Sequence, residues 1–175
     1  KLYGKEHPNY TTILNSVAMT YSYLGEYNKA LELNLVCLSL REELFGKNHL
    51  DYATSINNLA LSYSDLGDYD KSLELRLESL ALCENLVGKA HPDYAKGLNN
   101  LALIYSAIGD YDKALEMYLA CLALREKIFG KEHPAYASSL GTLAVTYSLL
   151  GDYDNALEMN LACLAIRERL FGKEH

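Results

Sequence analysis

Five histidines recur along this 175-residue sequence at one fixed spacing, and histidine is the commonest protein ligand for metal ions. They are His7, His49, His91, His133 and His175, each inside a copy of the motif Gly-Lys-X-His, which returns every 42 residues. A zinc ion needs its ligands about 2 Å from a single point, whereas these side chains belong to separate repeats. We therefore predict no metal site, and we interpret the histidines as corner residues that cap helix ends or bond neighbouring loops.

Two series of glutamates, each with one member in every repeat, could perform acid–base chemistry. The glutamates that recur at the same period are Glu32, Glu74, Glu116, Glu158 and Glu42, Glu84, Glu126, Glu168. An active site needs one position that differs from its equivalents, so these carboxylates predict solvated faces or links to nearby Lys and Arg rather than an acid–base pair. The sequence also lacks a nucleophile elbow, a phosphate-binding glycine loop and a Cys–His arrangement. We predict a protein that is not an enzyme and needs no cofactor.

The four cysteines could form two disulfides, so their spacing decides. Cys37, Cys121 and Cys163 share one position of the repeat, where the second repeat has Ser79. Equivalent positions in successive repeats lie about a helix pair apart, beyond the roughly 7 Å that a disulfide spans. We predict buried thiols in a reducing, cytoplasmic setting. Cys83 falls where the other repeats have arginine, and we expect it to be the most exposed of the four.

The charge and hydropathy of the sequence argue against two classes of partner, nucleic acids and membranes. The sequence has 16 Lys and Arg against 23 Asp and Glu, a net charge of -7, and no basic stripe that would bind a phosphate backbone. No apolar run approaches the roughly 18 residues that cross a bilayer. We therefore expect neither nucleic acid nor a membrane as partner. Because the first residue is Lys1, we also expect the sequence to be part of a longer chain.

The 42-residue unit reads as two helices. In residues 88–129, apolar side chains at i, i+4, i+7, i+8 and i+11 predict a first helix, helix A, that begins near Pro92 and ends at Gly109. The following Gly-Asp-Tyr-Asp predicts a turn with Asp112 as the N-cap of helix B. Helix B carries two adjacent apolar stripes and ends at Gly130, so it needs two partners: its own helix A and the next repeat.

These residues resemble the tetratricopeptide repeat (TPR) family. The family pattern of small residue, aromatic, Gly-Asp-Tyr and Ala is matched by Ala102, Tyr105, Gly109, Tyr111 and Ala114 and recurs four times in register. The usual unit has 34 residues, and the longer unit here, with "HPDYA", "LNNLA" and "LREKIFGK", is similar to the repeats of kinesin light chains. The resemblance implies an all-α, right-handed α-solenoid of antiparallel helix pairs.

The predicted organisation is a single TPR array over residues 1–175. Its complete repeats are 4–45, 46–87, 88–129 and 130–171, with partial repeats at 1–3 and 172–175. One position of helix B departs from the family, which prefers an aromatic there: it holds Asn34, Arg76, Tyr118 and Asn160. We expect packing at that point to rely on the neighbouring leucines Leu35, Leu77, Leu119 and Leu161.

Helix A lines the concave groove of TPR arrays, so the resemblance implies a peptide ligand there. In kinesin-light-chain-like repeats the second Asn of "NNLA" holds a bound peptide, a role that carries to Asn58 and Asn100 but not to Ser16 or Thr142. An Asn amide both donates and accepts hydrogen bonds, which suits an extended backbone. The same two side chains could instead bond their neighbouring helix. The other residues that we place in the groove are Asn15, Asn57, Asn99, Met19, Leu61, Leu103, Val145, Lys96 and Asp65.

Two functions from different classes follow. The first is a non-catalytic interaction scaffold that binds an extended, partly apolar protein segment or peptide in this groove. The alternative is a structural array that associates end to end with further copies of itself, because the terminal repeats of a solenoid expose faces built to receive another repeat.

Overall fold

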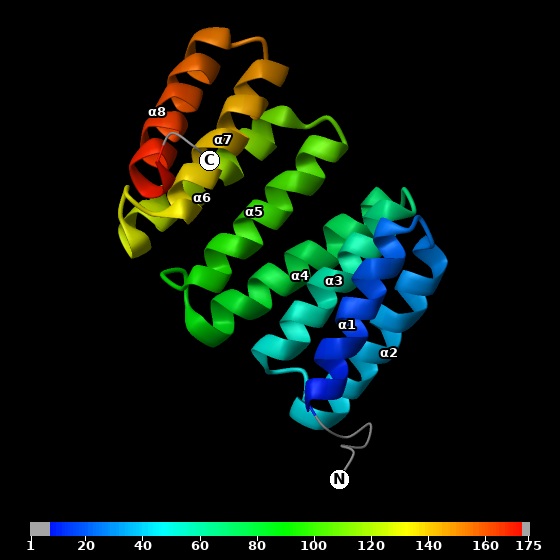
Figure 1. Cartoon of the computed structure of the whole chain (residues 1–175). Coiled ribbons are helices and arrows are strands. Elements are labelled where there is room, and N and C mark those ends of the chain that lie inside the picture. The colour runs from blue at the N-terminus through cyan, green and yellow to red at the C-terminus, as the bar shows by residue number, and fades with distance from the viewer. Residues whose placement is uncertain (1–7, 173–175) are drawn as a thin grey trace. The chain divides into compact units, whose positions relative to one another are not determined.

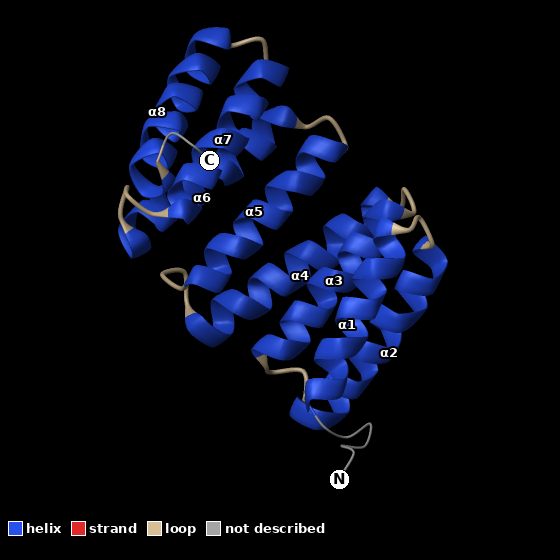
Figure 2. Cartoon of the chain, in the orientation of Figure 1, coloured by secondary structure: helices blue, strands red, loops and turns tan. Residues whose placement is uncertain are grey.

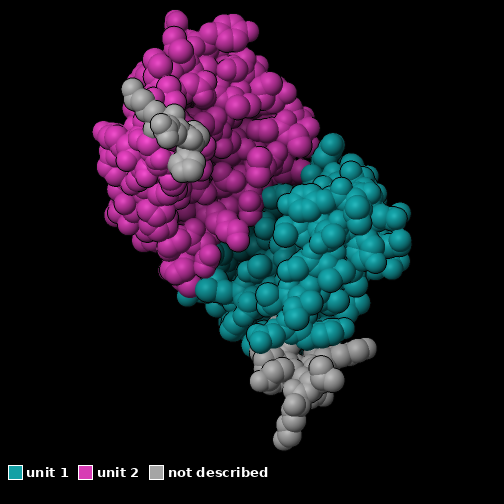
Figure 3. Space-filling model, in the orientation of Figure 1, with its two compact units in different colours: residues 1–86 teal, residues 87–175 magenta. Residues whose placement is uncertain are grey.

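The computed structural model describes residues 8–172, and nearly all of them are helical (Figures 1 and 2). The helices are α1 Pro8–Tyr23, α2 Tyr27–Phe45, α3 Leu50–Asp65, α4 Tyr69–Val87, α5 Pro92–Ala107, α6 Tyr111–Phe129, α7 Pro134–Leu149 and α8 Tyr153–Phe171. Odd-numbered helices have 16 residues and even-numbered helices 19. The described residues contain no strand, which confirms the all-α prediction. The chain divides into two compact units, residues 1–86 and 87–175, coloured separately in Figure 3.

The recurring Gly-Lys-X-His motif forms the corner between a B helix and the next A helix. Gly130 follows α6 with φ of +80°, a left-handed conformation that glycine adopts without steric cost. His133 then caps α7, because its Nδ1 accepts a hydrogen bond from the Ala135 N–H at 3.1 Å. His49 and His91 cap α3 and α5 in the same way. The predicted capping role is confirmed for these three histidines, while His7 and His175 lie outside the described residues.

The cap of helix B is Asp110, not Asp112 as the sequence predicts. Helix α6 begins at Tyr111, and the Asp110 carboxylate accepts from the Lys113 N–H at 3.2 Å. The prediction was wrong because Tyr111 is already helical, so the first aspartate of the motif flanks the helix and Asp112 lies inside its first turn. The Lys113 side chain also bonds this carboxylate, and together the two contacts lower the pKa of Asp110.

We expect Asp110→Ala to lower the free energy of unfolding by about 1 kcal/mol, the usual cost of a lost N-cap. Asp112→Ala is the matched control, since Asp112 is exposed in the first turn of the same helix, and it should shift stability by no more than about 0.5 kcal/mol. Urea denaturation followed by circular dichroism measures both. A larger loss of unfolding free energy for Asp112→Ala than for Asp110→Ala would contradict the assignment of Asp110 as the N-cap.

Each unit has its own core. In unit 1, Tyr52, Ile56 and Leu59 of α3 pack with Leu75 of α4. In unit 2, one cluster joins Ala102 of α5, Ala114 and Tyr118 of α6, and Leu143 of α7, and a second joins α7 to α8. Helix α6 is thus shared between the helix before it and the helix after it, as its two apolar stripes predict.

The packing of the unusual helix-B position is the reverse of our expectation. Asn34, Arg76 and Tyr118 are buried, whereas their leucine neighbours Leu35, Leu77 and Leu119 are each more than 40% exposed. The buried amide is paired: Asn34 Nδ2 donates to Ser62 Oγ at 2.8 Å and to the Asn58 carbonyl at 3.3 Å. A polar side chain replaces the family's aromatic here because the next A helix supplies a hydroxyl in the right place.

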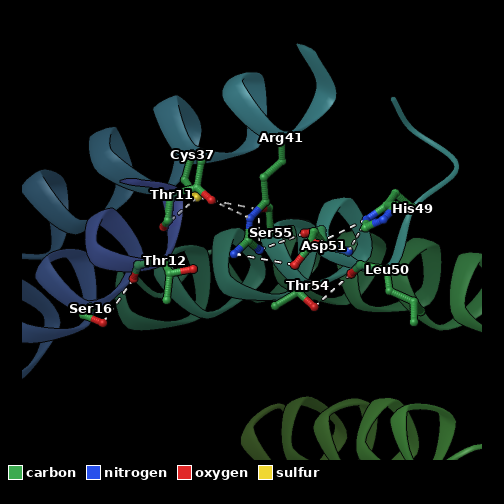
Figure 4. Close-up of polar contacts among 10 residues, drawn as sticks. All are labelled: Thr11, Thr12, Ser16, Cys37, Arg41, His49, Leu50, Asp51, Thr54 and Ser55. Atoms are coloured by element: carbon green, nitrogen blue, oxygen red, sulfur yellow. Dashed lines mark hydrogen bonds and ion pairs between the residues drawn. The ribbon is translucent and has the colours of Figure 1, made fainter. Parts of the chain in front are cut away.

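The cysteines are free and all four are buried. The buried thiol of Cys37 approaches the Thr11 carbonyl at 3.5 Å (Figure 4). The buried thiol of Cys121 approaches the Ala95 carbonyl at 3.2 Å. Our expectation that Cys83 is the most exposed of the four was wrong, because Cys83 is 5% exposed and Cys163 is 8% exposed. The position that it shares with Arg41 faces inward, and Arg41 is itself only 5% exposed, because its guanidinium is hydrogen-bonded inside the protein.

All four thiols should resist alkylation in the native state. Burial raises the pKa of Cys37 and Cys121 above the ordinary value of 9.0, so at neutral pH they hold their protons and the reactive thiolate is scarce. We expect iodoacetamide at pH 7.5 to label no thiol within minutes, and all four after unfolding in guanidinium. Mass spectrometry gives the count. Rapid labelling of Cys83 alone would show that the surrounding helices expose this thiol to solvent in the native state.

Candidate functional site

The candidate site is the part of the A helices that carries the predicted groove residues, and we call it the A-helix surface. It belongs to α1 and α3 in unit 1, and to α5 and α7 in unit 2. In unit 1 the helices α1 and α3 contact each other. Met19 and Leu61 are exposed there, and beside them lie half-buried amides. The predicted residues that unit 1 brings onto this surface are Asn15, Met19, Asn57, Asn58, Leu61 and Asp65.

Several polar groups of this surface are bonded within unit 1. The hydroxyl of Ser16 donates to the Thr12 carbonyl at 3.1 Å, and Ser22 of α1 donates to the Asp65 carboxylate of α3. Asp65 therefore ties α1 to α3. The Oδ1 atom of Asn15 is buried and has no hydrogen-bond partner among the described residues. The amide oxygen of Asn15 thus points into the protein and not into solvent.

The hydrogen bonds behind α3 explain how Asn58 is positioned. Asn34 of α2 reaches the backbone carbonyl of Asn58 and the hydroxyl of Ser62, so α3 is fixed through these two groups. This contact does not use the side-chain amide of Asn58. The amide therefore sits on a helix that α2 holds through these two groups.

In unit 2 the A-helix surface is hollowed, with a volume of about 480 Å³. The predicted residues Leu103 of α5 and Val145 of α7 both line this hollow, and both are exposed. Its full lining is Leu103, Ser106, Tyr118, Ser138, Gly141, Thr142, Val145, Thr146, Leu149 and Arg167. Lys96, Asn99 and Asn100 lie on α5 of the same unit but are not part of the lining.

The hollow contains Tyr118 and Arg167 of the B helices, which our sequence reasoning missed, and it also contains Gly141. This glycine takes the position of Asn15, Asn57 and Asn99, so one amide side chain is missing from the series. A Cβ atom at Gly141 would lie 3.8 Å from the Cys163 sulfur, an ordinary van der Waals contact. The break in the asparagine series was visible in the sequence and could have indicated a recess at this point.

The residue types of the A-helix surface suit recognition of a polypeptide chain. Within residues 8–172, no group of three or more His, Cys, Asp or Glu side chains could hold a metal ion. Hydroxyls, amides and apolar side chains make up most of the A-helix surface, together with Lys96, and Asp65 is bonded to Ser22. Such a surface can bind a chain through hydrogen bonds and apolar contacts.

Comparison with known proteins defines the class first. A tetratricopeptide-repeat family model matches residues 51–127 and 95–169, and a second one matches residues 11–51. The chain belongs to the tetratricopeptide-repeat family, whose proteins generally act as non-catalytic scaffolds for protein interactions. No curated protein matches the chain.

Solved structures refine the class. A putative kinesin light chain from Podosopora anserina with nearly identical TPR-like repeats has a TM-score of 0.81 and 25% identity, over 97% of this chain and 80% of that one. BtubC (BKLC) from P. vanneervenii has a TM-score of 0.79 and 24% identity, over 94% and 66%. The chain is therefore an all-α repeat solenoid of the kinesin light chain type.

A Rap protein complexed with Competence and Sporulation Factor shares the fold at a TM-score of 0.79 and 16% identity, over 95% of this chain and 44% of that one. The chain thus spans less than two thirds of BtubC and of this Rap protein. Among the described residues, no helix combines the length and apolar character needed to cross a membrane.

Proposed function

We propose that the chain is a non-catalytic scaffold that binds an extended, partly apolar peptide on its A-helix surface. The observation that carries this proposal is the repeated pairing of amide and apolar side chains on the same helices. Asn58 lies one helical turn from the exposed Leu61 on α3, and α5 repeats this pairing with Asn100 and Leu103. An amide can donate to a peptide carbonyl and accept from a peptide N–H, so it recognises backbone without demanding a side chain.

Each group has a role in this proposal. In each unit an asparagine holds peptide backbone, Asn58 in unit 1 and Asn100 in unit 2. Exposed apolar residues of the same unit receive peptide side chains: Met19 and Leu61 in unit 1, Leu103 and Val145 in unit 2. The hollow beside Leu103 and Val145 is large enough for such a side chain. The residues that would adjust sequence preference are Asn15, Asn57, Asn99, Lys96 and Asp65. Nothing in this role requires a cofactor or a metal.

A random-peptide display selection tests the proposal. The parent chain and the Asn58→Ala, Asn100→Ala double variant are selected in parallel after circular dichroism shows that both are folded. We expect a motif to enrich on the parent only, and its peptide to bind the variant roughly tenfold more weakly, because each lost hydrogen bond contributes about 0.5–1.5 kcal/mol.

The matched control is the double variant Asn28→Ala, Asn85→Ala, which removes two exposed asparagines from the B helices α2 and α4. It should keep the affinity of the parent. Equal binding by the parent and the Asn58, Asn100 variant would refute the proposed role of the amides.

The apolar half of the proposal has its own test. We expect Leu103→Asp, Val145→Asp to weaken the selected peptide by at least about tenfold, since each side chain loses apolar contact area worth about 25 cal/mol per Å². Isothermal titration calorimetry measures the change. Leu119→Asp is the control, because Leu119 is similarly exposed but lies on α6. If the control weakens binding as much, the hollow is not the site.

A further inference from the structure

Asp65 gives the A-helix surface of unit 1 a single negative charge at one end. Helix α1 contains no charged residue, and α3 contains only Asp51 and Asp65. Asp51 lies in the first turn of α3 beside His49, whose Nδ1 is 3.3 Å from its Oδ2. Asp65 is the last residue of the same helix. Its carboxylate is therefore separated from the other charge of α3 by the full length of an uncharged surface.

No cationic side chain among residues 8–172 pairs with Asp65. Its Oδ2 accepts a hydrogen bond from the Ser22 hydroxyl, which is neutral. The lysines at the starts of α2 and α4 have other partners: Lys29 lies 3.2 Å from Glu26, and Lys71 lies 2.7 Å from Glu74. The half-buried carboxylate of Asp65 thus keeps an uncompensated negative charge.

Two exposed apolar side chains lie one helical turn before this bonded pair. Helices α1 and α3 lie side by side (Figure 1). Leu61 precedes Asp65 on α3 and Met19 precedes Ser22 on α1, at spacings that place each pair on the same side of its helix. Leu103 holds the equivalent position of α5 and is exposed too. The exposure of Leu61 and Met19 therefore recurs with the repeat and does not mark an end of the chain.

We propose that this patch binds a lysine side chain of the peptide, and we call it the lysine subsite. It consists of Met19, Ser22, Leu61 and Asp65. The aliphatic stem of the lysine lies on Met19 and Leu61, and its ammonium group donates to the Asp65 carboxylate. This inference rests on the proposed peptide binding and adds to it the class of side chain that unit 1 selects.

The chemistry of the patch favours lysine over the other classes of side chain. Lysine can lay its four-carbon stem along an apolar surface while its ammonium group reaches a polar partner. An apolar residue would cover the Asp65 carboxylate without pairing it, which is costly, and an acidic residue would repel it. Arginine gains most from a carboxylate with two free oxygens, whereas Ser22 already bonds one of them.

The first test repeats the random-peptide display selection on the parent chain and on Asp65→Asn. Asparagine keeps an oxygen that can accept from Ser22, so the contact between α1 and α3 should remain and the variant should fold. We expect a lysine at one fixed position of the motif enriched on the parent, and no preference for lysine there on Asp65→Asn. Asp70→Asn is the matched control, because it removes the same charge from an exposed position of α4 and should enrich the lysine like the parent.

A double-mutant cycle then measures the contact itself. The probes are the enriched peptide and the same peptide with glutamine in place of the lysine, and fluorescence anisotropy gives their affinities. We expect the lysine peptide to bind Asp65→Asn roughly three- to tenfold more weakly than the parent, and the glutamine peptide to bind both chains alike. Added salt should narrow the difference for the lysine peptide, since salt screens a partly exposed ion pair.

The outcomes separate this inference from the proposed function on which it rests. If no peptide is enriched on the parent, peptide binding and the lysine subsite both fail. If a motif depends on Asn58 and Asn100 but contains no lysine, or if its lysine tolerates Asp65→Asn, peptide binding stands and the lysine subsite is overturned. Equal loss of the lysine preference on Asp70→Asn would attribute it to net charge and overturn the subsite as well.

Discussion

Leu143→Ala is expected to lower the free energy of unfolding by roughly 2 to 5 kcal/mol. The Leu143 side chain is fully buried and packs with Ala102 of α5 and with Ala114 and Tyr118 of α6. Truncation removes its apolar contacts and leaves a cavity between three helices that cannot all close on it. The cost should therefore exceed the transfer free energy of the lost methyl groups.

Urea denaturation followed by circular dichroism at 222 nm measures this loss as a lower urea concentration at the midpoint of unfolding. Leu103→Ala is the matched control, because it makes the same chemical change at a position that is 47% exposed, and it should cost less than about 1 kcal/mol. The slope of the transition must be compared as well, since an array of repeats can unfold in steps. Similar midpoints for the two variants would mean that Leu143 does not join α7 to its neighbours.

The position of Leu143 also shows what the repeat period predicts well. Its equivalents Leu59 and Leu101 are buried, while Val17 at the same position of α1 is 41% exposed. The period identifies the position as a core position, because the same residue type recurs on the same helix face. Burial itself depends on which neighbouring helices cover that face, as α5 and α6 cover Leu143. The helices, their order and their corners were predictable for the same reason, since Gly and His mark each corner locally and Pro follows the His at three of them.

The packing of helix B was less predictable because residue type misled us twice. Asparagine at 34 and arginine at 41 read as surface residues, yet both are buried. Each is tolerated because a partner stands in the following A helix, Ser62 for the amide and the Asp51 carbonyl for the guanidinium. Such partners are separated by 28 and 10 residues, and one sequence without its packing does not show that they meet.

The hollow of unit 2 illustrates a similar limit on predicting the site. Leu103 and Val145 were placed on the A-helix surface from the sequence, and the missing amide at Gly141 was visible there too. The contributions of Tyr118 and Arg167 were not, because they come from the B helices α6 and α8. Helical periodicity assigns a residue to a face of its own helix. A recess depends on the lengths and positions of side chains from several helices, which one sequence does not show.

Arg41→Ala should cost roughly 2 to 4 kcal/mol of stability, although the residue is charged and makes no close ion pair. Its guanidinium donates to the Asp51 carbonyl at 2.8 Å, to Ser55 Oγ at 3.2 Å and to Thr11 Oγ1 at 3.3 Å (Figure 4). These bonds join α2 to α1 and to α3. Removal of the arginine leaves buried acceptors without donors, and each unsatisfied group costs about 1–3 kcal/mol.

Hydrogen bonding, rather than charge pairing, should account for this loss. The Asp51 carboxylate is 4.0 Å from the guanidinium and its side chain is about half exposed, so it adds little. We therefore expect the difference between Arg41→Ala and the parent to change by less than about 0.5 kcal/mol between low and high salt, since salt screens exposed charges only. Arg41→Met separates packing from hydrogen bonding, because methionine keeps an apolar stem but has no donor.

Arg167→Ala is the matched control for this prediction. Arg167 has the same repeat position on α8, but it is exposed, so in dilute solution its loss should shift stability by no more than about 0.5 kcal/mol. If Arg41→Met retains the stability of the parent, the stem rather than the guanidinium stabilises α2. If Arg41→Ala and Arg167→Ala cost the same, burial of this position by the following A helix carries no energetic weight.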